Sequence, residues 1–135
     1  MLIGFIVDMT SEEAVKRLLK YDKVDVNTKV HKKGSTPLMH AAKKGLPNIV
    51  ALLLKYGARL SDTNLNGSNA VDIAERALIK LFEQLKQENL TKEEIKQKEA
   101  ARASHEKVFE LLTKLAKESG FVYIPREAQS FDKIN

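Results

Sequence analysis

The chain has few residues arranged for catalysis or metal binding. Its three histidines are His31, His40 and His105, and no pair of them has the spacing of a metal site. No serine, histidine and aspartate can be grouped as a nucleophilic triad, and no glycine-rich phosphate loop is present. Cysteine is absent, which excludes thiolate zinc sites, disulfides and cysteine nucleophiles. We therefore expect no catalytic residue, no metal and no cofactor.

Basic side chains are instead concentrated in the first half of the chain. The formal net charge is +5, and residues 26–61 contain seven lysines and arginines but no carboxylate. This asymmetry favours an acidic or anionic partner, because unbalanced charge attracts such a partner over a distance. The alternative is a lysine-rich face that contacts only water.

The composition is typical of one folded domain or a short row of repeated units. The chain has 135 residues, of which 43% are hydrophobic and 30% are charged. No apolar run approaches the ~20 residues that a membrane-spanning helix needs. The first residues lack a basic region and reach Asp8 too early for a secretory signal. We expect a cytoplasmic protein that does not bind membranes.

The sequence repeats itself with a period of 33 to 35 residues. Residues 14–21 match residues 49–56 at an offset of 35, with coinciding apolar positions. Residues 31–38 match residues 64–71 at an offset of 33, with a shared Gly-Ser pair. A fixed period of this length indicates stacked structural repeats, each too small to bury its own hydrophobic face.

One unit has the signals of two short helices. Thr36 and Pro37 are a helix cap and a first helical residue, and Gly45 ends that helix after about nine residues. A second helix begins at Pro47 or Asn48, carries an apolar stripe and closes at Gly57. The small side chains of residues 41–42 let a neighbouring helix approach closely.

The motif of residues 34–58 is more specific than composition. It combines a Thr-Pro-Leu start at residues 36–38, an Ala-Ala pair, a glycine turn and a Leu-Leu-Leu…Gly-Ala exit. This arrangement resembles an ankyrin repeat. The resemblance implies an all-α solenoid of stacked helix-turn-helix units in a single domain. Its parts would be a capping or partial repeat at 1–30, a full repeat at 31–63, an enlarged repeat at 64–120 and a tail at 121–135.

The C-terminal third departs from the regular pattern. No glycine turn follows Ala74, so the helix that begins near residue 70 should continue to Leu85. Thr91 and Glu94 form a capping box, which predicts a second long helix that Gly120 stops. We expect these two helices to form an extended antiparallel hairpin. The alternatives are a separate helix that bends away and a plain surface protrusion, and the apolar tail is expected to cover the last helix.

The resemblance also implies a binding face. In such a stack the first helices and the loops between repeats line one concave surface. The variable family positions that contact partners fall on Lys32, Lys33, Ser35, Met39, Lys43 and Lys44 in the full repeat, and on Leu65, Asn66, Ser68, Asp72 and Arg76 in the next. The lysines would steer an acidic surface, while Met39 and Leu65 would add short-range apolar contact.

These features predict a non-catalytic, monomeric protein-interaction module with an acidic protein partner and no small-molecule substrate. A module delivered into a host cell as an effector is the alternative to a cytoplasmic one. Nucleic-acid binding is disfavoured, since aromatic residues are 6% of the chain and no groove-entering motif is recognised. Self-association through the C-terminal hairpin and a passive spacer are the remaining alternatives.

Overall fold

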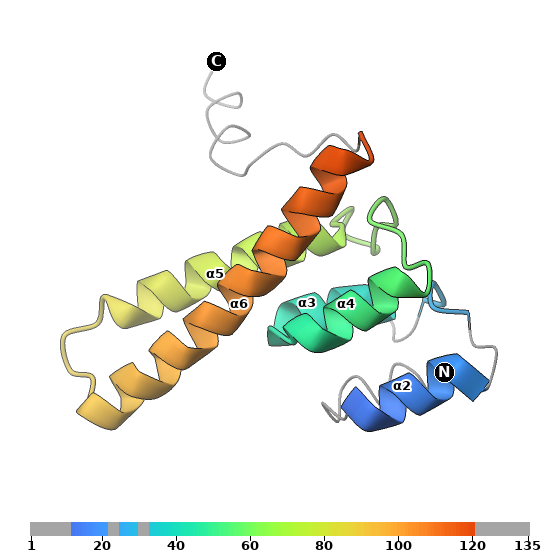
Figure 1. Ribbon diagram of the computed structural model, residues 1–135. Coiled ribbons are helices and arrows are strands. Elements are labelled where there is room, and N and C mark those ends of the chain that lie inside the picture. Colours follow the sequence, from blue (N-terminus) through green and yellow to red (C-terminus); the bar gives the residue numbers. More distant parts are fainter. Residues whose placement is uncertain (1–11, 22–24, 30–32, 121–135) are drawn as a thin grey trace, which may run out of the picture.

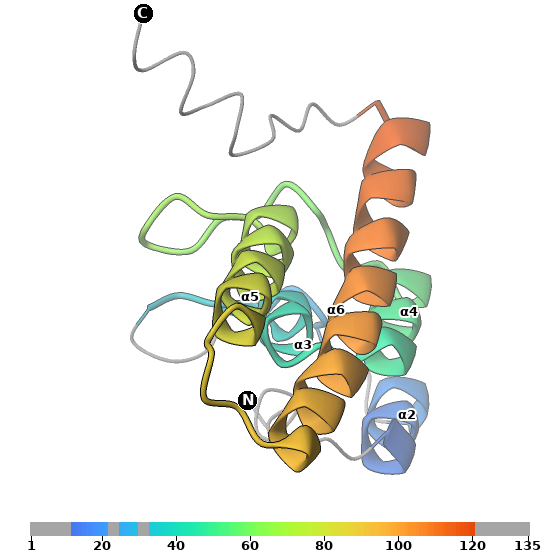
Figure 2. The ribbon, with the colours of Figure 1, turned by 90° about the vertical axis from the view of Figure 1, so that its left-hand side faces the viewer.

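Five helices in two rows make up the part of the chain that the structure describes. The computed structural model describes residues 12–21, 25–29 and 33–120. The helices are α2 (Glu12–Tyr21), α3 (Pro37–Lys44), α4 (Pro47–Lys55), α5 (Ala70–Leu85) and α6 (Lys92–Glu118). Helices α3 and α5 pack together as one row, and α2, α4 and α6 form the other (Figure 1, Figure 2). The predicted all-α stack of helix pairs is confirmed.

Helix α3 begins where its capping residues predict. The Thr36 hydroxyl accepts a hydrogen bond from the Met39 N–H at 3.3 Å, and Pro37 occupies the first turn. The Met39 sulfur accepts the Thr36 N–H at 3.4 Å, so a thioether fills the role that a glutamate has in the usual capping box. Two N–H groups that would otherwise lack partners are therefore satisfied inside the stack.

Helices α3 and α4 end in the same left-handed turn. In α3 the N–H of Gly45 reaches Ala42 O and the N–H of Leu46 reaches Ala41 O, at 3.3 and 3.1 Å. In α4 the N–H of Gly57 and that of the next residue bond to the carbonyls of residues 54 and 53 in the same pattern. This is the Schellman arrangement, which needs a positive φ, and glycine supplies it at both positions.

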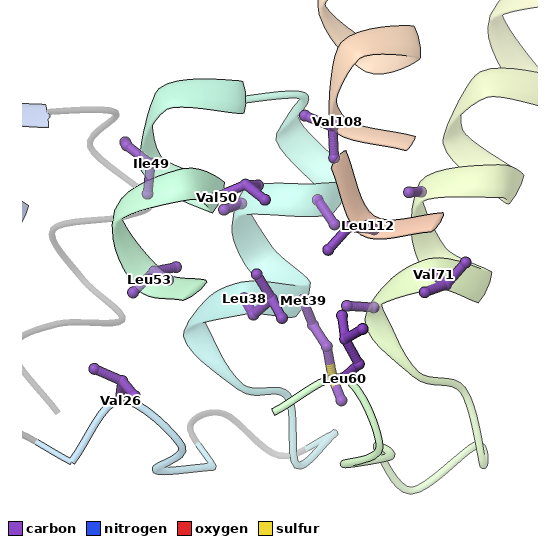
Figure 3. Close-up of a cluster of buried hydrophobic side chains, with 14 of the residues drawn as sticks. Val26, Leu38, Met39, Ile49, Val50, Leu53, Leu60, Val71, Val108 and Leu112 are labelled. Atoms are coloured by element: carbon purple, nitrogen blue, oxygen red, sulfur yellow. The ribbon is translucent and has the colours of Figure 1, made fainter. Parts of the chain in front are cut away.

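The core lies between the two rows. Figure 3 shows Leu38 of α3 and Val50 of α4 between Leu53 of α4 on one side and Val108 and Leu112 of α6 on the other. All five side chains belong to one continuous buried cluster. The apolar stripes predicted for the repeat helices are therefore the surfaces that face one another, as a stack of two-helix units requires.

The loops after successive repeats are joined through one amide side chain. Asn27 Nδ2 donates to the Gly57 carbonyl at 3.1 Å, and Asn27 Oδ1 accepts the Arg59 N–H at 2.9 Å. A second link joins α4 to α2, where Asn48 Nδ2 donates to Glu12 Oε2 at 3.3 Å. Both contacts satisfy polar groups across the repeat boundary, so they fix the offset of one unit on the next.

Helices α5 and α6 form the extended hairpin. They contain 16 and 27 residues, and α6 packs along α5 while also contacting α4 and α3 (Figure 1). The Thr91 hydroxyl accepts the Glu94 N–H at 3.1 Å and the Glu94 carboxylate accepts the Thr91 N–H at 3.2 Å, as its capping box predicts. Lys98 Nζ also donates to Gln84 Oε1 across the hairpin at 3.3 Å. The hairpin is thus one packed unit, and α6 does not bend away from it.

Two expectations concern residues outside the described ranges. They are the start of the capping or partial repeat, at residues 1–11, and the tail at 121–135 that is expected to cover the last helix. Both stay predictions.

Leu53 is the side chain on which we test the stacked core. It is fully buried in α4, so Leu53→Ala removes apolar contacts and leaves a cavity, and unfolding should become easier by about 2–5 kcal/mol. Urea unfolding followed by far-UV circular dichroism measures the change.

Leu65→Ala is the matched control, since Leu65 is 78% exposed. Its stability should stay within about 0.5 kcal/mol of the parent chain. Equal losses for the two variants would contradict the packing of α4 in the core.

Candidate partner-binding groove

A groove of about 1080 Å³ lies between α3, α5 and the loops that precede them. One residue of α6 also reaches it. The described residues that line it are Lys33, Ser35, Met39, His40, Lys43, Lys44, Asn64, Asn66, Ile73, Arg76, Ala77, Lys80, Leu81, Gln84 and His105. The groove therefore runs from the loop ends of the first-row helices toward the C-terminal hairpin.

The charge of this groove has one sign. Its described lining contains five lysine or arginine side chains and two histidines, and no aspartate or glutamate. Lys43 and Lys80 form no ion pair within the described residues. Cations that face a shared concavity raise its positive potential, because field lines are focused there and no carboxylate stands among its described lining residues.

Hydrogen bonds hold the two loops at the groove entrance side by side. The Leu65 N–H donates to the Lys33 carbonyl at 2.9 Å, which ties the loop of one repeat to the loop of the next. Within the second loop, Asn64 Oδ1 accepts the N–H groups of Asn66 and Ser68 at 2.9 and 3.1 Å. This turn leaves Leu65 at the tip with its side chain in solvent.

Most of the residues predicted to contact a partner are brought together by this geometry. Those that line the groove are Lys33, Ser35, Met39, Lys43, Lys44, Asn66 and Arg76. Leu65 lies at the entrance on the loop tip, beside the lining residue Asn66. Lys32 lies outside the described residues.

Three predicted contact residues also have roles inside the fold. Met39 borders the groove, but its side chain is 2% exposed and its sulfur caps α3, so it offers little of the expected adaptable surface contact. Ser68 is equally buried, and its hydroxyl accepts a hydrogen bond from the Arg76 guanidinium. The Asp72 carboxylate accepts the Asn69 N–H at 3.1 Å in the cap of α5, and Asp72 does not line the groove. The family's pattern of variable positions does not take such local hydrogen bonds into account.

Sequence reasoning missed the apolar side chains of α5 and its later turns as part of the site. Ile73, Ala77 and Leu81 face the groove at intervals of four residues, with Lys80 and Gln84 beside them. The helical spacing of Ala77 and Leu81 is visible in the sequence. It does not reveal that these side chains are only half-buried and line a groove.

His105 is the second contribution that sequence reasoning missed. Its Nδ1 lies 2.8 Å from the Ala101 carbonyl oxygen and its Nε2 lies 3.2 Å from the Lys43 carbonyl oxygen. A Cβ atom on Gly45 would come within 2.5 Å of the His105 ring. The imidazole thus fits over the glycine turn of α3, where it closes the hairpin end of the groove.

A family model matches the region of the chain that contains the groove helices α3 and α5. The family model described as "Ankyrin repeats (3 copies)" matches residues 5–98, which is more than half of the chain. The chain belongs to the ankyrin repeat family. Ankyrin repeats are protein-interaction modules and are typically non-catalytic. Helices α3 and α5 and the loops before them lie within the matched residues.

A curated relative supports the same assignment. A protein of Rickettsia bellii (strain RML369-C) that is named as an ankyrin repeat protein is 32% identical over 76 residues. The match covers 53% of this chain and 45% of the relative, so the chain spans less than half of that protein's length.

Within the described ranges, no group of three or more histidine, aspartate or glutamate side chains could hold a metal ion. None of the described helices is long and apolar enough to cross a membrane.

Gly45→Ala tests the contact between the ankyrin stack and the hairpin. Gly45 has a φ of 70°, so alanine costs about 1–2 kcal/mol in the backbone. The added methyl group also displaces the His105 ring from the two carbonyl oxygens that its nitrogens face. We expect a larger loss of stability than for Gly67→Ala, since Gly67 has a φ of 76° and open space around it.

A double-mutant cycle isolates the ring contact. In a His105→Ala background, Gly45→Ala should cost no more than Gly67→Ala does, as measured by urea unfolding. Equal costs of the two glycine substitutions in the parent chain would show that His105 does not lie over Gly45.

Proposed function

We propose that the chain is a non-catalytic interaction module that binds an acidic surface of a partner protein in the groove between α3 and α5. The observation that carries this proposal is the lining itself, in which cationic side chains from two repeats face one concavity without a carboxylate among its described residues. Membership in a family of protein-interaction modules supports a protein as the partner.

The proposed mechanism is recognition by a rigid scaffold. Stacking, helix caps and the link between Leu65 and Lys33 fix the backbone before the partner arrives. Little conformational entropy is then lost on binding, so more of the contact energy appears as affinity. The exposed cations Lys33, Lys43 and Lys44 accelerate the encounter with an acidic surface, and the exposed Leu65 adds apolar contact at the entrance.

Nucleic acid remains the alternative ligand for a cationic groove. The lining offers no phenylalanine, tyrosine or tryptophan on which bases could stack among its described residues. A phosphate backbone would also leave the apolar side chains of Ile73, Ala77 and Leu81 on α5 in contact with water.

We propose that the chain acts as a monomer without a small-molecule substrate. We propose that it acts in the cytoplasm, either of the cell that produces the protein or of a host cell into which the protein is delivered.

Charge reversal of three groove lysines tests the assignment. We expect Lys33→Glu, Lys43→Glu and Lys44→Glu together to weaken partner binding by about tenfold or more, because attraction becomes repulsion. The melting temperature should change little, since all three side chains are exposed. Capture from nuclease-treated extract of the source cells, followed by titration of each captured protein, measures the effect.

The matched control reverses Lys86, Lys92 and Lys96 on the hairpin, which are exposed and do not line the groove. This variant has the same net charge as the groove variant and should capture the same proteins as the parent chain. The proposal is wrong if both variants bind alike, or if capture depends on nucleic acid.

A further inference from the structure

The groove combines an apolar floor with cationic rims. On α5, Ile73, Ala77 and Leu81 succeed one another at intervals of four residues and are half-buried. Arg76 directly precedes Ala77, and Lys80 directly precedes Leu81. The side chains of Arg76 and Lys80 are exposed. Because neighbouring positions of a helix lie about 100° apart, α5 presents an apolar strip with a cationic row along one side.

Helix α3 supplies cations on the other side of the strip. Lys43 and Lys44 stand in its last turn, are exposed and line the groove. Their position at the C-terminal end of α3 is electrostatically favourable for positive charge. An occupant would therefore meet apolar side chains below it and cations on both flanks.

The groove also continues past the regular repeat. Helix α3 has 8 residues and α5 has 16, so at the repeat offset of 33 the last position of α3 corresponds to Ala77. Lys80, Leu81 and Gln84 lie on the additional turns, and His105 of α6 closes that end. The lining of α5 from Ile73 to Gln84 covers 11 residue steps, or about 16 Å at 1.5 Å each.

We propose that the groove binds an amphipathic acidic α-helix of about three turns from the partner protein. Apolar side chains of this helix lie on Ile73, Ala77 and Leu81. Its carboxylates flank that stripe and face Arg76 and Lys80 on one side and Lys43 and Lys44 on the other. The inference rests on the proposed function and specifies the local structure of the partner.

Backbone hydrogen bonding favours a helix over an extended segment. Between α3 and α5 the groove is walled by the sides of helices, whose N–H and C=O groups are paired within each helix, so this part of the groove offers no strand edge. An extended peptide would bring unpaired backbone groups onto the apolar floor at a cost in free energy. A helix satisfies its own backbone, and residues one turn apart match the spacing along α5.

The experiment uses synthetic peptides and the full chain. The probe is a fluorescein-labelled peptide of about 14 residues with leucines on one helical face and glutamates on both sides of it. The comparison peptide has the same composition with leucine and glutamate mixed around the helix. Fluorescence anisotropy should show at least about tenfold tighter binding of the amphipathic peptide.

Variants of the hairpin part of the groove provide the second readout. Lys80→Glu and, separately, Leu81→Ala should each weaken the amphipathic peptide by about fivefold or more. Lys86→Glu is the matched control, because Lys86 is an exposed cation on the same hairpin that does not line the groove. Circular dichroism checks that each variant is folded. If Leu81→Ala does not fold, Lys80→Glu alone decides the test.

The results distinguish the proposed helical ligand from the more general proposal of an acidic partner. Equal binding of both peptides, lost on charge reversal of Lys33, Lys43 and Lys44, overturns the helix and leaves the acidic partner in place. Binding that is insensitive to Lys80→Glu also overturns it. If neither peptide binds, or a duplex DNA of equal charge binds more tightly, the inference fails. The capture experiment then judges the proposed function separately.

Discussion

Close approach of helix backbones is the constraint on which this molecule depends. Ala41 and Ala42 of α3 and Ala70 and Ala74 of α5 are all buried, within the core that joins the two rows. Their side chains end at Cβ, so neighbouring helices pack with little space between them and the larger leucines and valines interlock around them. Bulkier residues at these positions would separate α3 from α5 and open the groove that lies between them.

The groove is a consequence of how the stack is held. The bonds of Asn27 and the bond from Leu65 to Lys33 both join the connection between α2 and α3 to the connection between α4 and α5. With these two connections fixed to each other, the cations of two separate units keep their positions relative to one another. A charge pattern spread over 48 residues of sequence, from Lys33 to Lys80, therefore acts as one surface.

Local signals made much of the fold predictable. Thr36, Pro37, Gly45 and Thr91 determine helix ends through bonds within a few residues, and the structure has each end where the sequence predicts it. The site was predictable only in part. The cap formed by Met39 uses a sulfur that no capping rule anticipates, and the position of His105 depends on the packing of α6, which no repeat period specifies.

The reach of α6 across the molecule bears on how the chain folds. A repeat array contacts only its nearest neighbours, so its units can order from any starting point and propagate. Here α3 and α6 belong to neighbouring repeats, yet the imidazole of α6 and the carbonyl it meets on α3 are 62 residues apart in sequence because the hairpin is long. Closing so large a loop slows the search for the native state and delays its completion until α6 has left the ribosome. During synthesis, α3 and α4 would emerge before α6, and the sides of these helices that contact α6 would be exposed to solvent until then.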